Sequence, residues 1–150
     1  MGKTVKNSFS LIEVLVFITI LSLVFITATA VTIFSLRALT ISQHKILATH
    51  YAEEALEWVK SEKDKDWLNF TQYASDAGIT YCIISFDWFT EGACDDSYFL
   101  GTPNIFLREV KLTNIGINPV SQTDVEVVVH WQEINDTYNV TLKTSLKILE

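Results

Sequence analysis

Proline and glycine are almost missing from the first half of this 150-residue chain. No proline precedes Pro103, and no glycine lies between Gly2 and Gly78. Proline removes a backbone hydrogen-bond donor and glycine loses the most backbone entropy on folding, so both residues interrupt helices. Their absence predicts one long helix over residues 9–64.

Charged side chains are missing from residues 14–36, a run of 23 residues in which a few Ser and Thr are the only polar residues. As a helix this run would be about 34 Å long, which is enough to cross the hydrocarbon core of a bilayer. The sequence therefore predicts a single membrane-spanning segment, placed within residues 9–37.

Basic residues lie before this segment, and acidic residues predominate after it. Lys3 and Lys6 precede it, whereas residues 38–150 contain 8 Lys and Arg against 17 Asp and Glu, a net charge of −9. Because positively charged flanks stay in the cytoplasm, we expect the N-terminus inside and residues 38–150 outside the cytoplasmic membrane. An acidic outer domain also argues against direct nucleic-acid binding, which needs Lys and Arg to contact phosphates.

Histidine is scarce, and the sequence lacks the common catalytic motifs. His44 and His50 are six residues apart, which places them on different helix faces, and His130 is the third and last histidine. There is no His-Glu-x-x-His, no Gly-rich phosphate loop and no Gly-x-Ser-x-Gly. The adjacent Asp95 and Asp96 fall short of the six or more oxygen ligands of a calcium site. We therefore expect no enzymatic activity, no catalytic residues, no cofactor and no metal.

Cysteine occurs twice, at Cys82 and Cys94, both in the part of the chain expected outside the cytoplasm. Two cysteines at this spacing in an oxidising compartment favour a disulfide, and two buried thiols are the alternative. No nearby histidine completes a zinc ligand set.

The second half of the chain changes from a helical to a strand period. Apolar residues recur along the end of the predicted helix at Ile41, Ala48, Ala52, Ala55, Leu56 and Val59, which form one stripe. Residues 79–86 are rich in β-branched and aromatic residues, and residues 105–112 are a second strand candidate. Apolar residues alternate with more polar ones over residues 125–131 and 138–148. Asn135-Asp136 predicts a hairpin between the last two segments. The expected fold is α+β, with an antiparallel sheet covering the helix stripe.

Residues 6–15 read Lys-Asn-Ser-Phe-Ser-Leu-Ile-Glu-Val-Leu, a basic leader that runs into an apolar helix with one acid near its start. This resembles the type IV prepilin signal of type IV pilins and type II secretion pseudopilins. The resemblance implies peptidase cleavage between Ser8 and Phe9, N-methylation of Phe9, and a register-setting role in assembly for Glu13, the fifth mature residue. The sequence departs from the family at Ser8, where glycine is usual, and at Ala30, where many members have proline.

The resemblance implies a pilin-like organisation: a leader (1–8), a membrane-spanning and filament-core helix (9–37) and an extracytoplasmic α+β domain (38–150). It implies a structural subunit of a type IV pilus-like or pseudopilus filament, outside the cell or in the periplasm. A looser similarity of residues 52–57 and 105–149 to minor pilins favours a minor subunit. The implied partners are the prepilin peptidase, other pilin subunits, the inner-membrane assembly platform and, before assembly, membrane lipid.

Two alternatives to a pilin-like subunit agree with many of the same sequence features. Ala28-Thr29-Ala30 has the A-x-A form that signal peptidase cleaves, which would release a secreted domain, although the apolar run continues past it and is longer than the usual 7–15 residues. A single-span membrane protein with an outer domain and no filament role explains the composition as well, and only the leader motif and Glu13 speak against it.

Overall fold

The computed structural model describes residues 10–88, 90–95, 97–116, 120–133 and 136–148. The chain divides into two compact units, Met1–Ile41 and Ser42–Glu150, and each is described by itself. Helix α1 (Leu11–Lys65) begins in the first unit and ends in the second. It continues through Ala30, and its bounds agree with the predicted helix over residues 9–64.

The ends of α1 carry the side chains that the helix dipole favours. Glu13 lies in the first turn, and Lys63 and Lys65 lie in the last turn. The next residue, Asp66, caps the four-residue helix α2 (Trp67–Phe70), because its carboxylate accepts a hydrogen bond from the Asn69 N–H at 3.1 Å. α1 therefore ends at Lys65, one residue beyond the predicted end at residue 64.

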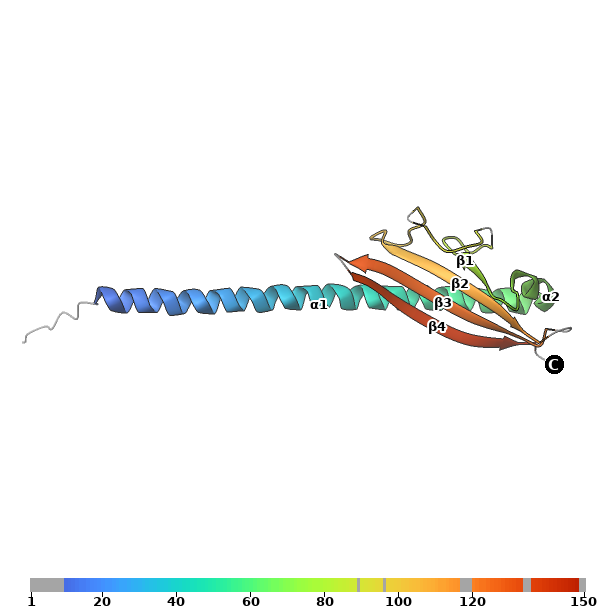
Figure 1. Ribbon diagram of the computed structural model, residues 1–150, viewed down its shortest axis with the longest axis horizontal. Coiled ribbons are helices and arrows are strands. Elements are labelled where there is room, and N and C mark those ends of the chain that lie inside the picture. Colours follow the sequence, from blue (N-terminus) through green and yellow to red (C-terminus); the bar gives the residue numbers. More distant parts are fainter. Residues whose placement is uncertain (1–9, 89, 96, 117–119, 134–135, 149–150) are drawn as a thin grey trace, which may run out of the picture. The chain divides into compact units, whose positions relative to one another are not determined.

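The second unit contains a four-stranded antiparallel sheet, with the strands in the order β1-β2-β3-β4 (Figure 1). Each strand pairs with the next one along the chain, so the sheet is a meander. The strands are β1 (Ile79–Cys82), β2 (Phe106–Ile115), β3 (Gln122–Glu133) and β4 (Asp136–Lys147). Glu133 pairs with Asp136 across the predicted hairpin, whose turn lies outside the described residues.

The core lies between the sheet and the last part of α1, as the alternation predicts. Four residues of the helix stripe are fully buried: Ala48, Ala52, Ala55 and Val59. Three of them are alanines, which let the helix backbone approach the sheet closely. On the sheet side, alternate residues of β2 and β3 are buried while their neighbours are more exposed; the inward set includes Phe106, Val110, Leu112, Val125, Val127, Val129 and Trp131. The expected α+β architecture is confirmed.

The first strand is shorter than the segment predicted for it. β1 ends at Cys82 rather than at residue 86, because the carbonyls of Ile83 and Ile84 turn toward the guanidinium of Arg108 and accept its hydrogen bonds at 3.0 and 3.3 Å. The outer edge of β1 is covered by the chain's own backbone: Cys82 N–H donates to Thr90 O at 2.9 Å, and Gly92 N–H donates to Thr80 O at 2.8 Å.

Helix α2 and the 3-10 turn η1 (Thr71–Tyr73) were not predicted from the sequence. They are joined to the far end of the sheet by Asn114, whose amide donates to the carbonyls of Thr71 and Ala74 at 2.9 and 3.1 Å. These short elements bring Phe70 and Tyr73 to a cluster of aromatic side chains around Trp88.

Candidate functional site

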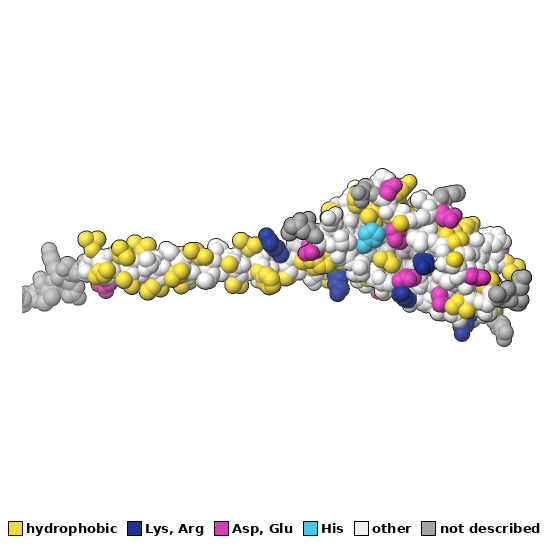
Figure 2. All heavy atoms as spheres, in the orientation of Figure 1, with side chains coloured by type: hydrophobic (Ala, Val, Ile, Leu, Met, Phe, Trp, Pro, Cys, Tyr) yellow, Lys and Arg dark blue, Asp and Glu magenta, His cyan; other side chains and the backbone are white. Residues whose placement is uncertain are grey.

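The apolar surface of the first unit is the most prominent feature of the described chain. The large apolar side chains from Leu11 to Leu39 are all exposed, with exposed fractions from 41% at Leu21 to 90% at Leu11. Figure 2 shows hydrophobic side chains gathered along this part of α1, whereas charged side chains are spread over the second unit. Within the described residues, α1 is the one helix long and apolar enough to cross a membrane.

Glu13 is the one acid of this surface. It is exposed in the first turn of α1, where its N–H donates to Ser10 O at 3.0 Å. No ion pair or side-chain hydrogen bond engages Glu13 within the described part of the chain, so its carboxylate is available to a partner. The predicted cleavage and methylation residues, Ser8 and Phe9, lie outside the described residues.

Five of the six polar residues of the uncharged run, all except Ser35, hydrogen-bond to their own helix. In each case the side-chain hydroxyl donates to the carbonyl oxygen four residues earlier, at 2.8–3.1 Å; the residues are Thr19, Ser22, Thr27, Thr29 and Thr32. Such back-bonding satisfies a hydroxyl without a partner from outside the helix.

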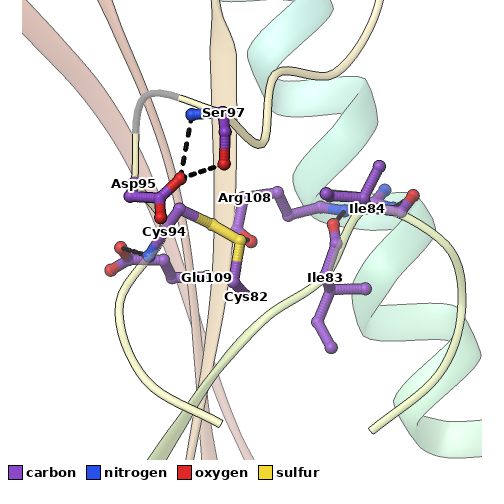
Figure 3. Close-up of a disulfide and its surroundings, with 8 residues drawn as sticks. All are labelled: Cys82, Ile83, Ile84, Cys94, Asp95, Ser97, Arg108 and Glu109. Atoms are coloured by element: carbon purple, nitrogen blue, oxygen red, sulfur yellow. Dashed lines mark hydrogen bonds between the residues drawn. A yellow bond between two sulfur atoms is a disulfide. The ribbon is translucent and has the colours of Figure 1, made fainter. Parts of the chain in front are cut away.

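Cys82 and Cys94 form a disulfide, with Cα atoms 4.9 Å apart, which confirms the predicted pair (Figure 3). The backbone N–H of Cys94 also donates to a carboxylate oxygen of Glu109 at 2.8 Å, and Glu109 lies directly across the sheet from Cys82. The disulfide and this hydrogen bond hold the loop after β1 against the face of the sheet that points away from α1.

Next to the disulfide, Arg108 lies in the core with 1% of its surface exposed (Figure 3). Its guanidinium donates to the carbonyls of Ile83 and Ile84, to Tyr51 O at 3.2 Å and to a carboxylate oxygen of Glu54 at 3.1 Å. Burial lowers the pKa of Arg108, and the hydrogen bond and charge of Glu54 oppose that shift. Arg108 therefore joins β2 to α1 and to the disulfide loop at a single point.

Comparisons with models of protein families, with curated proteins and with solved structures found no match for this chain.

The three histidines do not form a site together. A ring nitrogen of His44 contacts the carboxylate of Glu133, which also accepts a hydrogen bond from the Trp131 indole at 3.1 Å. His50 packs edge-on against Tyr51, and His130 lies on the outer face of β3. Among the described residues, no three His, Cys, Asp or Glu side chains gather in a way that could hold a metal ion.

Asp95 is engaged by its own loop. Its carboxylate accepts hydrogen bonds from the hydroxyl and the backbone N–H of Ser97, which lower the pKa of Asp95 below its usual value. Asp96, the adjacent acid that was considered with Asp95 as a calcium ligand and rejected, lies outside the described residues.

Sequence reasoning did not identify Arg108 or the aromatic cluster. Arg108 stands at an inward position of β2, since it lies between the buried Phe106 and Val110 in the strand alternation. The alternation of inward and outward residues along β2 predicts that the side chain of Arg108 points inward, and this was the signal that the sequence offered. The aromatic cluster joins rings from five different segments, and no local pattern connects them.

Proposed function

We propose that this chain is the precursor of a type IV pilin-like or pseudopilin subunit, held in the cytoplasmic membrane by α1 until it joins a filament. The observation that carries the proposal is the exposed apolar helix that bears a single acid, Glu13, in its first turn. In this proposal the prepilin peptidase cuts between Ser8 and Phe9, and the second unit lies outside the membrane.

The exposed apolar surface of α1 supports the proposal that lipid covers this helix before assembly and that other subunits cover it afterwards. Monomeric soluble proteins rarely expose apolar patches beyond a few hundred Å². A lipid bilayer and a bundle of helices can both cover every side of such a helix with apolar groups. Residues 11–39 of α1 have apolar side chains on every side.

Glu13 supports the filament role over a simple membrane anchor. A carboxylate within the apolar part of a spanning helix costs roughly 2.5–3.5 kcal/mol on insertion scales, and such residues commonly mark functional sites. In the proposal, cleavage creates the positive amine of Phe9, and Glu13 pairs with that amine on a neighbouring subunit. A pair of this kind gains strength in a surround of low dielectric constant.

Replacing Glu13 by Gln tests this proposal, because the change removes the charge and keeps the size. We expect membrane levels of Glu13→Gln to hold or rise, since insertion becomes easier, while its incorporation into filaments falls at least several-fold. Tagged variant and wild-type chains would be co-expressed, filaments sheared off, and the tagged fraction compared between filament and membrane.

Glu53→Gln is the matched control, because Glu53 is an exposed acid on the same helix but belongs to the second unit. It should enter filaments as the wild type does. Equal tagged fractions of Glu13→Gln in filament and membrane would contradict the proposal and favour a single-span protein without a filament role.

A further inference from the structure

A hollow of about 560 Å³ opens on the face of the sheet that points away from α1. It lies at the end where β2 begins and β3 ends, beside the pair Leu107–His130, and the disulfide residue Cys94 forms part of its rim. This volume is within the range of small-molecule binding sites.

Four polar side chains in the hollow, of which all but His130 are exposed, make no hydrogen bond within the described part of the chain: Asn104, His130, Gln132 and Thr137. Together they offer both donors and acceptors. Some polar groups elsewhere on the same face are engaged with one another. Asp124 accepts hydrogen bonds from Ser145 and Gln122, and Glu126 forms an ion pair with Lys143 at 2.9 Å.

No Lys, Arg, Asp or Glu among the described residues lines the hollow. Glu109, the nearest acid along β2, has an oxygen occupied by the N–H of Cys94. A cationic ligand would therefore lose its hydration without a compensating carboxylate, and an anionic one would also meet the negative charge of this unit. The lining favours a ligand that carries no charge.

Apolar and aromatic surface adjoins the four polar groups. Phe99 is 39% exposed at the hollow, and Leu107 lies in its floor. A purely apolar ligand would leave the four polar groups without partners, which is unfavourable. A ligand with hydroxyl groups around its edge and C–H groups on its faces satisfies both kinds of surface.

We propose that this hollow binds a neutral saccharide. The hydroxyls of the sugar exchange hydrogen bonds with Asn104, Gln132 and Thr137, and the ring of Phe99 packs against a face of the sugar. The proposal is independent of whether the chain joins a filament, because it concerns only the second unit.

The test uses the full chain in lipid nanodiscs, since detergents with sugar headgroups would compete for the site. Cellotetraose, galactotriose and N-acetylchitotriose serve as neutral probes, and oligogalacturonate serves as the acidic probe. Saturation-transfer NMR and calorimetry should detect at least one neutral probe. Asn104→Ala and Gln132→Ala should each raise its Kd by about two- to tenfold, the effect of losing one hydrogen bond.

Gln72→Ala is the matched control, because Gln72 is an exposed amide in η1, which is joined to the opposite end of the sheet. Its Kd should equal that of the wild type. The proposal is overturned if no neutral probe binds at about 10 mM, if oligogalacturonate binds more tightly than every neutral probe, or if Gln72→Ala weakens binding as much as the other two substitutions.

Discussion

A guanidinium buried in a protein core needs a partner for each of its donors, and at Arg108 those partners come from two segments far apart in the sequence. Two are the carbonyls that follow β1, and the others belong to residues 51 and 54 of α1. Glu54 is 44% exposed at its side chain, so its ion pair with Arg108 is partly screened by solvent. Loss of Arg108 therefore has its largest cost at the backbone carbonyls, which would lose their hydrogen bonds from the guanidinium.

Arg108→Met keeps most of the side-chain volume and removes every donor, which leaves buried carbonyls unpaired. We expect a loss of roughly 2–4 kcal/mol in the free energy of unfolding, measured by urea unfolding with tryptophan fluorescence. Lys111→Met is the control, because Lys111 is exposed on the same strand, and it should change stability by no more than about 0.5 kcal/mol. An equally stable Arg108→Met would show that Arg108 contributes nothing net to the fold.

Asp124 gives the second unit a defined pH dependence. The Ser145 hydroxyl, followed by the Gln122 amide, holds the pKa of the Asp124 carboxyl below its usual value. Because folding lowers this pKa, the Asp124 carboxylate stabilises the folded state at pH values above the pKa of the unfolded chain, which is about 3.9. This contribution is lost as the pH falls through the lower pKa of the folded state. Ser145→Ala should raise the pKa of Asp124, as followed by NMR titration of its carboxyl carbon.

The control for that titration is Thr141→Ala, which removes a hydroxyl from the same face of β4 without touching Asp124. An unchanged pKa in Ser145→Ala would mean that the 2.6 Å hydrogen bond between Ser145 and Asp124 does not persist in solution.

At the scale of the elements, the disulfide holds the loop that supplies two of the acceptors of Arg108. Closing a loop of this size stabilises the fold by about 3 kcal/mol in the chain-entropy account. A Cys82→Ser/Cys94→Ser variant should unfold at lower urea concentration than the wild type by a corresponding amount. Adding reductant should destabilise the wild type and leave the double variant unchanged, whereas a wild type indifferent to reductant would indicate that its thiols are free.

The sequence predicted the elements whose residues repeat with a clear period. The stripe through Ala48, Ala52 and Val59 and the alternation around Val127 were sufficient for the long helix and the sheet, because burial on one face imposes those periods. Helix α2 has four residues, which is too short for a period to appear. β1 ended early because Arg108 draws the following carbonyls away from the strand, and a contact across 24 residues leaves no local signal.

At the scale of the whole molecule, charge and hydropathy separate along the chain, and this separation underlies the proposed route from membrane to filament. If that route is correct, mass spectrometry of sheared native filaments should find a mature chain that begins at N-methylated Phe9. The same spectra should show the chain as a minor fraction of filament protein. A chain that begins at Val31 would indicate release by signal peptidase, and an intact Met1 would contradict processing altogether.

The hydroxyl groups of α1 have a consequence for moving this helix from one environment to another. Thr19, Ser22, Thr27, Thr29 and Thr32 donate their protons within the helix. These hydroxyl groups therefore need no hydrogen-bond partner outside the helix, so lipid chains and apolar protein side chains are nearly equivalent surroundings for them. In the proposed route, transfer of α1 from bilayer to filament is then decided mainly by van der Waals contact and by the charge of Glu13.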